Sequence, residues 1–254
     1  MDHPFFSFDI PFASFSPMHW WTLVVFAGLL ALVIRVGTRL SPEQNLWLGR
    51  IIAVFLSVTV VVFSWIHSYN GLFNHRVDLP LSICNLFALL APILFWQPNF
   101  RRFEIIYFLV LCGTFQAMLT PDLYAGFPSY GFFKYWIVHG GLVILVIHHL
   151  LAFRLIPEAR SMLRTFIWLN LYLLLLIPVN LTLDANYFYL MEKPLNPSIL
   201  DYFGPWPFYI LICELLAMGF FAIAYVPIYL GKKYFPIAST MSSVKNTATD
   251  RTSS

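Results

Sequence analysis

Charged side chains are scarce in this chain: Asp, Glu, Lys and Arg make up 11% of its 254 residues, and 59% are hydrophobic. Soluble domains carry about 25% charged residues. A water-soluble surface cannot be built from this composition, which excludes a soluble globular protein. The net charge of +3 is small and its cations flank apolar runs, so a nucleic-acid partner is excluded as well.

Motifs of soluble enzymes are also missing. The chain has no G-x-S-x-G, H-E-x-x-H or C-x-x-C motif and no glycine-rich phosphate loop. A soluble-type hydrolase, a zinc protease and an ATPase are therefore disfavoured, and we expect neither a metal ion nor a cofactor. The three cysteines, Cys84, Cys112 and Cys213, lie within apolar runs and do not form a disulfide framework.

Long apolar runs are the main content of the chain. They predict helices near residues 19–38, 49–68, 79–96, 102–120, 131–153, 161–183 and 206–230. Each approaches or exceeds the ~20 residues that cross the hydrocarbon core. The run at 79–96 is the shortest and suits a little-tilted or partly re-entrant span. The sequence thus predicts an all-α, monomeric, polytopic membrane protein with a seven-helix transmembrane bundle.

The basic residues set the expected orientation. Twelve of the fifteen Lys and Arg residues fall on one side of the predicted bundle, and only Arg76, Lys134 and Lys193 fall on the other. Because basic residues concentrate in cytoplasmic loops, we expect the N-terminus outside and the C-terminus inside.

The ends of the chain flank a single predicted domain. Residues 1–18 lack a basic n-region, which disfavours a cleavable signal peptide, and their Phe and Pro content suggests an outer interfacial segment. Residues 19–238 form the predicted seven-helix domain. Residues 239–254 are rich in Ser and Thr and predict a disordered cytoplasmic tail.

Five polar side chains fall at a similar depth in the outer half of the predicted bundle, each on a different helix: Cys84, Gln116, His139, Asn180 and Glu214. Ionisable groups inside a membrane are rare and mark functional sites by default. The pattern predicts chemistry at a site that faces lipid or a cavity.

Cys84 and His139 are the candidates for catalysis. Cys84 shares a predicted face with Ala88 and Ala91, so it is either a small packing residue or a nucleophile. His139, with Tyr135 one turn earlier, is either an interhelical hydrogen-bonding group or a general base within reach of the thiol. Glycines at 140 and 141 permit close approach of a helix or a substrate.

The remaining polar residues support two interpretations each. Glu214 has no basic residue on its own helix, so it either orients His139 or bridges helices. Gln116, followed by Asp122 in the next loop, and Asn180 could each donate hydrogen bonds to a substrate carbonyl or phosphate. Plain helix–helix hydrogen bonds are the alternative.

Several segments resemble a known family. They are LPLSICNLFALL at 79–90, FEIIYFLVLCGTFQAMLTPDL at 103–123, GFP at 126–128 with FFKYWIVHGG at 132–141, and NYFYLMEKPLNPSILDYFGPWPFYIL at 186–211. In order and spacing they resemble the YwaF-like bacterial membrane proteins, related to transmembrane protein 164. A more distant similarity is to androgen-induced-gene and ADTRP-type lipid hydrolases. Many bacterial members have histidine at the position of Ser82.

The resemblance implies a function and a location. It implies phospholipid acyl transfer through a cysteine acyl-enzyme, with Cys84 as nucleophile and His139 as the assisting base. It also implies a bacterial cytoplasmic membrane, with membrane lipids as the partners. We therefore expect a lipid acyltransferase. The alternatives are a non-enzymatic lipid- or small-molecule-binding protein or transporter, and a lipid ester hydrolase.

Overall fold

The computed structural model describes residues 3–6, 10–123, 125–193 and 199–234. The regular structure within these residues is helical, apart from one isolated β-bridge between Pro11 and Ala125. Six helices are long and apolar enough to cross a membrane: α1 (Pro17–Gly37), α2 (Pro42–Tyr69), the continuous helix Phe100–Leu119, α6 (Tyr130–Ala152), α7 (Ala159–Leu183) and α8 (Phe208–Tyr234). The prediction of an all-α, multi-pass membrane protein is confirmed. The predicted tail at 239–254 lies outside the described residues.

The third predicted span is shorter than expected. Helix α3 (Ile83–Phe95) has 13 residues. At 1.5 Å per residue it is ~20 Å long, against ~30 Å of hydrocarbon. Pro80 explains the late start, since its ring disfavours helical backbone at Leu79 and removes an N–H donor. The count of seven spanning helices is therefore not confirmed, because α3 does not reach the length needed to cross.

Helix starts follow the local capping residues. Ser41 precedes Pro42, and its hydroxyl accepts from the Gln44 backbone N–H while the Gln44 side chain accepts from the Ser41 N–H. This reciprocal pair is a capping box with proline at the first helical position. It places the start of α2 seven residues before the predicted 49, because the apolar run alone marks only the membrane-embedded part.

The helix Phe100–Leu119 changes its winding in the middle. It consists of α4 (Phe100–Leu109), the π-helical turn η2 (Val110–Thr114) and α5 (Phe115–Leu119). A π-helical turn inserts extra backbone into an α-helix and occurs frequently at functional sites. Here it alters the direction in which the side chains of residues 110–114 point.

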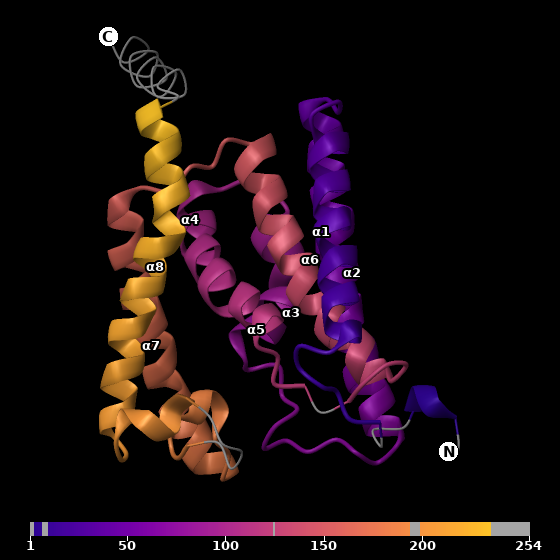
Figure 1. Cartoon of the computed structure of the whole chain (residues 1–254), viewed down its shortest axis with the longest axis vertical. Coiled ribbons are helices and arrows are strands. Elements are labelled where there is room, and N and C mark those ends of the chain that lie inside the picture. The colour runs from indigo at the N-terminus through magenta and orange to yellow at the C-terminus, as the bar shows by residue number, and fades with distance from the viewer. Residues whose placement is uncertain (1–2, 7–9, 124, 194–198, 235–254) are drawn as a thin grey trace.

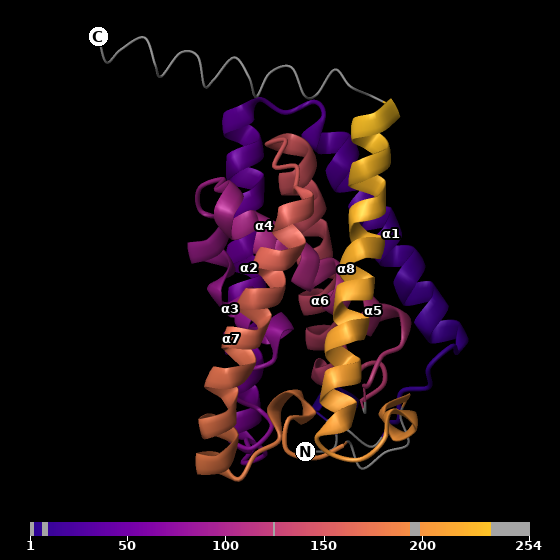
Figure 2. The same ribbon diagram turned by 90° about the vertical axis from the view of Figure 1, so that its left-hand side faces the viewer.

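Helix α6 lies at the centre of the bundle, in contact with α1, α2, α3 and α5. Figure 1 shows α7 and α8 as a separate pair on one side, with α4 between this pair and the rest. The view turned by 90° shows the start of α1 and the end of α8 at opposite ends of the bundle (Figure 2). We call the end that carries residues 70–82, 120–123, 125–129, 184–193 and 199–207 the loop-rich end, and the opposite one the basic end.

A buried carboxylate joins α4 to α7 near the basic end. Glu104 is 1% exposed and forms an ion pair with Arg164 at 2.9 Å. Its carboxylate also accepts from the Ser161 hydroxyl, and Arg101 lies 3.5 Å away. Because every charge in this cluster has a partner, it fixes the position of α7 relative to α4.

Candidate functional site

Cys84 lies in the first turn of α3. It is the second helical residue, after the N-cap Ser82, whose side chain makes no capping hydrogen bond. First-turn N–H groups have no partner within a helix, and this end of the helix dipole favours an anion such as a thiolate. Because α3 begins at Ile83 and not at the predicted residue 79, Cys84 lies nearer the start of the helix than the apolar run indicated.

The sulfur of Cys84 has a specific neighbour. Cys84 Sγ lies 3.3 Å from Oγ1 of Thr114, which is fully buried in the π-helical turn. Ala88 and Ala91, on the same face of α3, are also fully buried. The predicted close packing therefore holds for the two alanines, whereas the thiol faces a hydroxyl.

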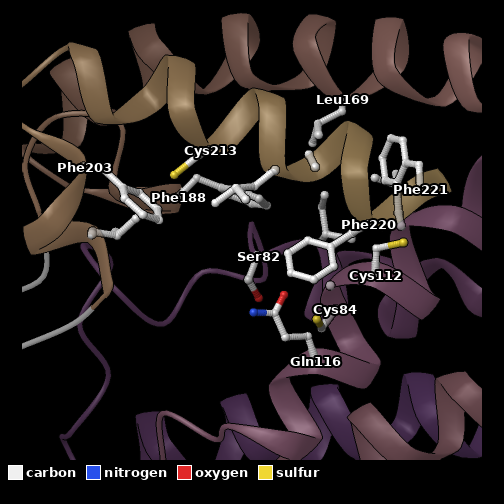
Figure 3. A pocket seen from close by; sticks show the side chains of 16 residues that line it. Ser82, Cys84, Cys112, Gln116, Leu169, Phe188, Phe203, Cys213, Phe220 and Phe221 are labelled. Carbon is white, nitrogen blue, oxygen red and sulfur yellow. The ribbon is translucent and has the colours of Figure 1, made fainter. Parts of the chain in front are cut away.

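An apolar cavity of about 390 Å³ adjoins Cys84. It lies between the start of α3, the η2 turn, α7, α8 and the loop helices η3 (Tyr187–Tyr189) and η4 (Ile199–Phe203). Figure 3 shows Ser82, Cys84 and Gln116 together on one side of it. Ligand pockets typically measure about 300–1,000 Å³. The cavity can therefore accept a hydrocarbon chain with a polar group at one end.

The other two cysteines line the same cavity. Cys112 comes from the η2 turn and Cys213 from α8, and both are free thiols (Figure 3). All three cysteines of the chain therefore line one cavity, which composition did not predict. Cys84 differs from the others in lying at a helix N-terminus.

His139 lies on α6 with a defined tautomer. Its Nδ1 donates to the Tyr135 carbonyl at 2.7 Å, which leaves Nε2 with a free lone pair. The two rings stack with centroids 4.1 Å apart, and the Tyr135 hydroxyl donates to the Ala117 carbonyl. Among the described residues no hydrogen bond joins His139 to Cys84.

The glycines after His139 serve helix packing. A Cβ at Gly140 would lie 2.1 Å from the Phe26 ring of α1, and one at Gly141 would lie 2.5 Å from Leu56 of α2. The predicted close approach is thus made by two neighbouring helices, which these residues allow to pack directly on α6.

Three of the predicted site residues bind other groups. The Glu214 carboxylate on α8 accepts from the Asn170 amide on α7 at 2.8 Å. Asn180 exchanges two hydrogen bonds with the backbone of Tyr187. Asp122 accepts from the Tyr189 hydroxyl at 3.3 Å. In these contacts Glu214 bridges two helices, whereas Asn180 and Asp122 bind residues of the loop that follows α7 and not another long helix.

Two residues of the site were not predicted. Ser82 could have been found, because a serine directly before an apolar run is a helix-start signal. Thr114 carries no comparable signal, since its position depends on the π-helical turn. The described residues contain no group of three or more His, Cys, Asp or Glu arranged to hold a metal ion.

Comparison with known proteins gives one match. No curated protein and no solved structure matches the chain. The model of the TMEM164 family matches residues 14–225, which run from just before α1 to within α8 and include every residue of the site. The chain therefore belongs to the TMEM164 family.

Proposed function

We propose that this protein transfers acyl chains between membrane lipids through a thioester on Cys84. Membership of the TMEM164 family is consistent with a lipid-related function in the membrane. The observation that carries the proposal is a thiol in the first turn of a helix, at the edge of an apolar cavity of about 390 Å³. The cavity suits an acyl chain, and the thiol suits the ester carbonyl at its end.

The proposed reaction has two balanced steps. The Cys84 sulfur attacks the ester carbonyl carbon, a C–S bond forms, the C–O bond to glycerol breaks, and the lyso-lipid leaves as an alcohol. His139 takes the thiol proton and delivers it to the leaving oxygen. The hydroxyl of an acceptor lipid then attacks the thioester, His139 removes its proton, and the thiol is restored when His139 returns that proton to sulfur.

The negative charge that develops on the carbonyl oxygen must be stabilised by hydrogen-bond donors. The first-turn N–H groups of α3 and the amide of Gln116 lie on the same side of the cavity as Cys84. Preorganised donors of this kind stabilise an oxyanion strongly in a site of low dielectric. In the proposal they form the oxyanion hole, and the Ser82 hydroxyl is a further donor next to it.

The tautomer of His139 fits a general base. Its Nδ1–H is engaged by the Tyr135 carbonyl, so Nε2 is the nitrogen that can accept a proton. The Cys84 sulfur contacts Thr114, and the hydrogen bonds of catalytic groups often tighten only in the complex with substrate. Glu214 has Asn170 as its partner, so we assign it to helix bridging rather than to His139.

The proposed site opens toward the outer leaflet of a bacterial cytoplasmic membrane. The basic end carries most of the Lys and Arg residues, which favours placing it in the cytoplasm. Residues 70–82 and α3 together then act as the seventh crossing, because Arg50 near the start of α2 donates to the Trp96 carbonyl just after α3. We also propose that the protein acts as a monomer.

The test uses Cys84→Ala with Cys112→Ala as a matched control in the same cavity. Purified protein is incubated with a labelled phospholipid and a lyso-lipid acceptor. We expect a hydroxylamine-sensitive adduct on Cys84 and label in the acceptor for wild type and Cys112→Ala, and neither for Cys84→Ala.

Other outcomes replace the proposal. An adduct followed only by fatty-acid release indicates a lipid ester hydrolase. If no adduct forms with any common phospholipid and Cys84→Ala keeps wild-type cellular activity, a lipid-binding protein or transporter is the better assignment.

A further inference from the structure

A second apolar groove adjoins the cavity of Cys84. It has a volume of about 180 Å³ and lies between α3, α4 and α7. Ile83, Leu109 and Leu169 line both spaces, so the two meet at these three side chains. The groove therefore continues the cavity of Cys84 toward the basic end.

The length of the groove corresponds to one leaflet. Its lining on α3 runs from Ile83 to Leu94, eleven residues apart, or ~16 Å along the helix axis. One leaflet of hydrocarbon is about half of ~30 Å. A chain that starts at the first turn of α3 and follows this helix would end beside Leu94.

Most of the lining offers nothing to a polar headgroup. Arg102, at the far end, donates to the carbonyls of Ile93 and Gln97, and the Tyr172 hydroxyl donates to the Leu81 carbonyl. The other lining side chains are apolar. Since the polar groups are engaged by the backbone, the groove is suited to hydrocarbon.

We propose that this groove binds the distal part of the acyl chain whose carbonyl lies at Cys84. The inference rests on the proposed function and adds where the distal part of a long acyl chain would lie and what would limit its length. Ile83, Leu109 and Leu169 guide the chain from the cavity into the groove, and the end of the groove at Leu94 and Arg102 sets the preferred chain length.

Photolabelling tests the location without turnover. The full chain in nanodiscs is exposed to phospholipids with a diazirine either at the terminal carbon or next to the carbonyl of the acyl chain. We expect the terminal probe to label α4 and α7 at Ile105 and Trp168, and the other probe to label the η2 turn at Gly113. Equal labelling of all lipid-facing helices by the terminal probe would indicate bulk lipid and overturn the inference.

Blocking the groove tests its effect on chain length. Ile105→Trp fills the groove, and Ile167→Trp makes the same change at an exposed position on α7 outside it. We expect Ile105→Trp to lower adduct formation on Cys84 from a palmitoyl donor about tenfold or more, because several methylene groups lose their binding site. A butanoyl donor should react as in wild type, and Ile167→Trp should change neither reaction.

Failure of this inference differs from failure of the proposed function. Chain binding in the groove is overturned if Ile105→Trp slows the palmitoyl and butanoyl reactions equally and the terminal probe labels this variant at the same sites as wild type. The thioester chemistry of the wild-type protein is not affected by that result. If wild type forms no adduct at all, acyl transfer fails, and the photolabelling alone decides whether the groove binds the chain.

Discussion

At the scale of single residues, the position of the Cys84 sulfur depends on Thr114. The two side chains come from different helices, and their contact requires the π-helical turn that carries Thr114. A hydroxyl fixed next to a thiol can donate to the thiolate and so favour the charged form at its place of reaction. Thr114 is therefore a positioning residue for the proposed nucleophile.

Thr114→Val should slow formation of the Cys84 adduct about tenfold, the effect of losing one hydrogen bond to a charged group. Valine has nearly the shape of threonine, so the unfolding temperature should change little. Thr114→Ser keeps the hydroxyl and should react close to the wild-type rate. The rate of Cys84 alkylation against pH should fall by a similar factor, because both reactions need the thiolate; it is measured in a Cys112→Ala, Cys213→Ala background, where Cys84 is the only thiol. Equal rates for Val and Ser would assign Thr114 to packing alone.

The sequence could not predict the direction in which these side chains point. Cys84 and Gln116 were expected at the site and do line the cavity. Glu214 and Asn180 have a similar predicted depth, but their amide and backbone partners lie elsewhere. Counting residues along a helix gives the level of a side chain in the membrane. It does not give the rotation of that helix against its neighbours, which tertiary packing decides.

At the scale of helices, α6 packs closely because it has glycines at the crossing points. Gly140→Ala should lower the free energy of unfolding by about 1–3 kcal/mol, since the new methyl overlaps the Phe26 ring and α1 must shift. Gly219→Ala on α8 is the control, because no atom lies within 4 Å of its added Cβ. There the change should be neutral or slightly stabilising. Thermal unfolding in detergent compares the two, and equal destabilisation would contradict the packing role.

The Glu104 cluster should hold α7 against α4. Glu104→Gln leaves Arg164 without its anion and should cost about 2–3 kcal/mol of stability. Arg101→Gln removes an exposed member of the same cluster at 3.5 Å and should have little effect. A lower unfolding temperature for Glu104→Gln alone is expected. If both variants unfold like wild type, the cluster does not stabilise the helix pair.

Helix boundaries were predictable where the chain carries local signals. The serine–proline pairs at 16–17 and 41–42 mark the starts of α1 and α2. The start of α3 was missed because the apolar run continues through Pro80, and hydropathy does not register the effect of a proline on the backbone before it. The π-helical turn was not predictable, since it results from packing and not from composition.

At the scale of the whole molecule, the distribution of basic residues predicts the orientation in the membrane. Tags near Arg101 and after Lys233 should be protected in intact cells, and a tag in the 184–207 loop should react with an impermeant reagent. Permeabilised cells provide the control, in which all three tags should react. An accessible tag after Lys233 in intact cells would reverse the orientation, and the proposed outward-facing site with it.

The short α3 also has a consequence for biogenesis. With only 13 residues, α3 is a weak insertion signal for the translocon, so in the proposed topology it would enter the membrane with the help of its longer neighbours. The groups that hold its first turn are translated later. Thr114 follows Cys84 by 30 residues, and Tyr172, whose hydroxyl donates to the Leu81 carbonyl, follows Leu81 by 91 residues. A nascent chain that stops before α7 therefore lacks part of the proposed site, which is completed only after α7 has been synthesised.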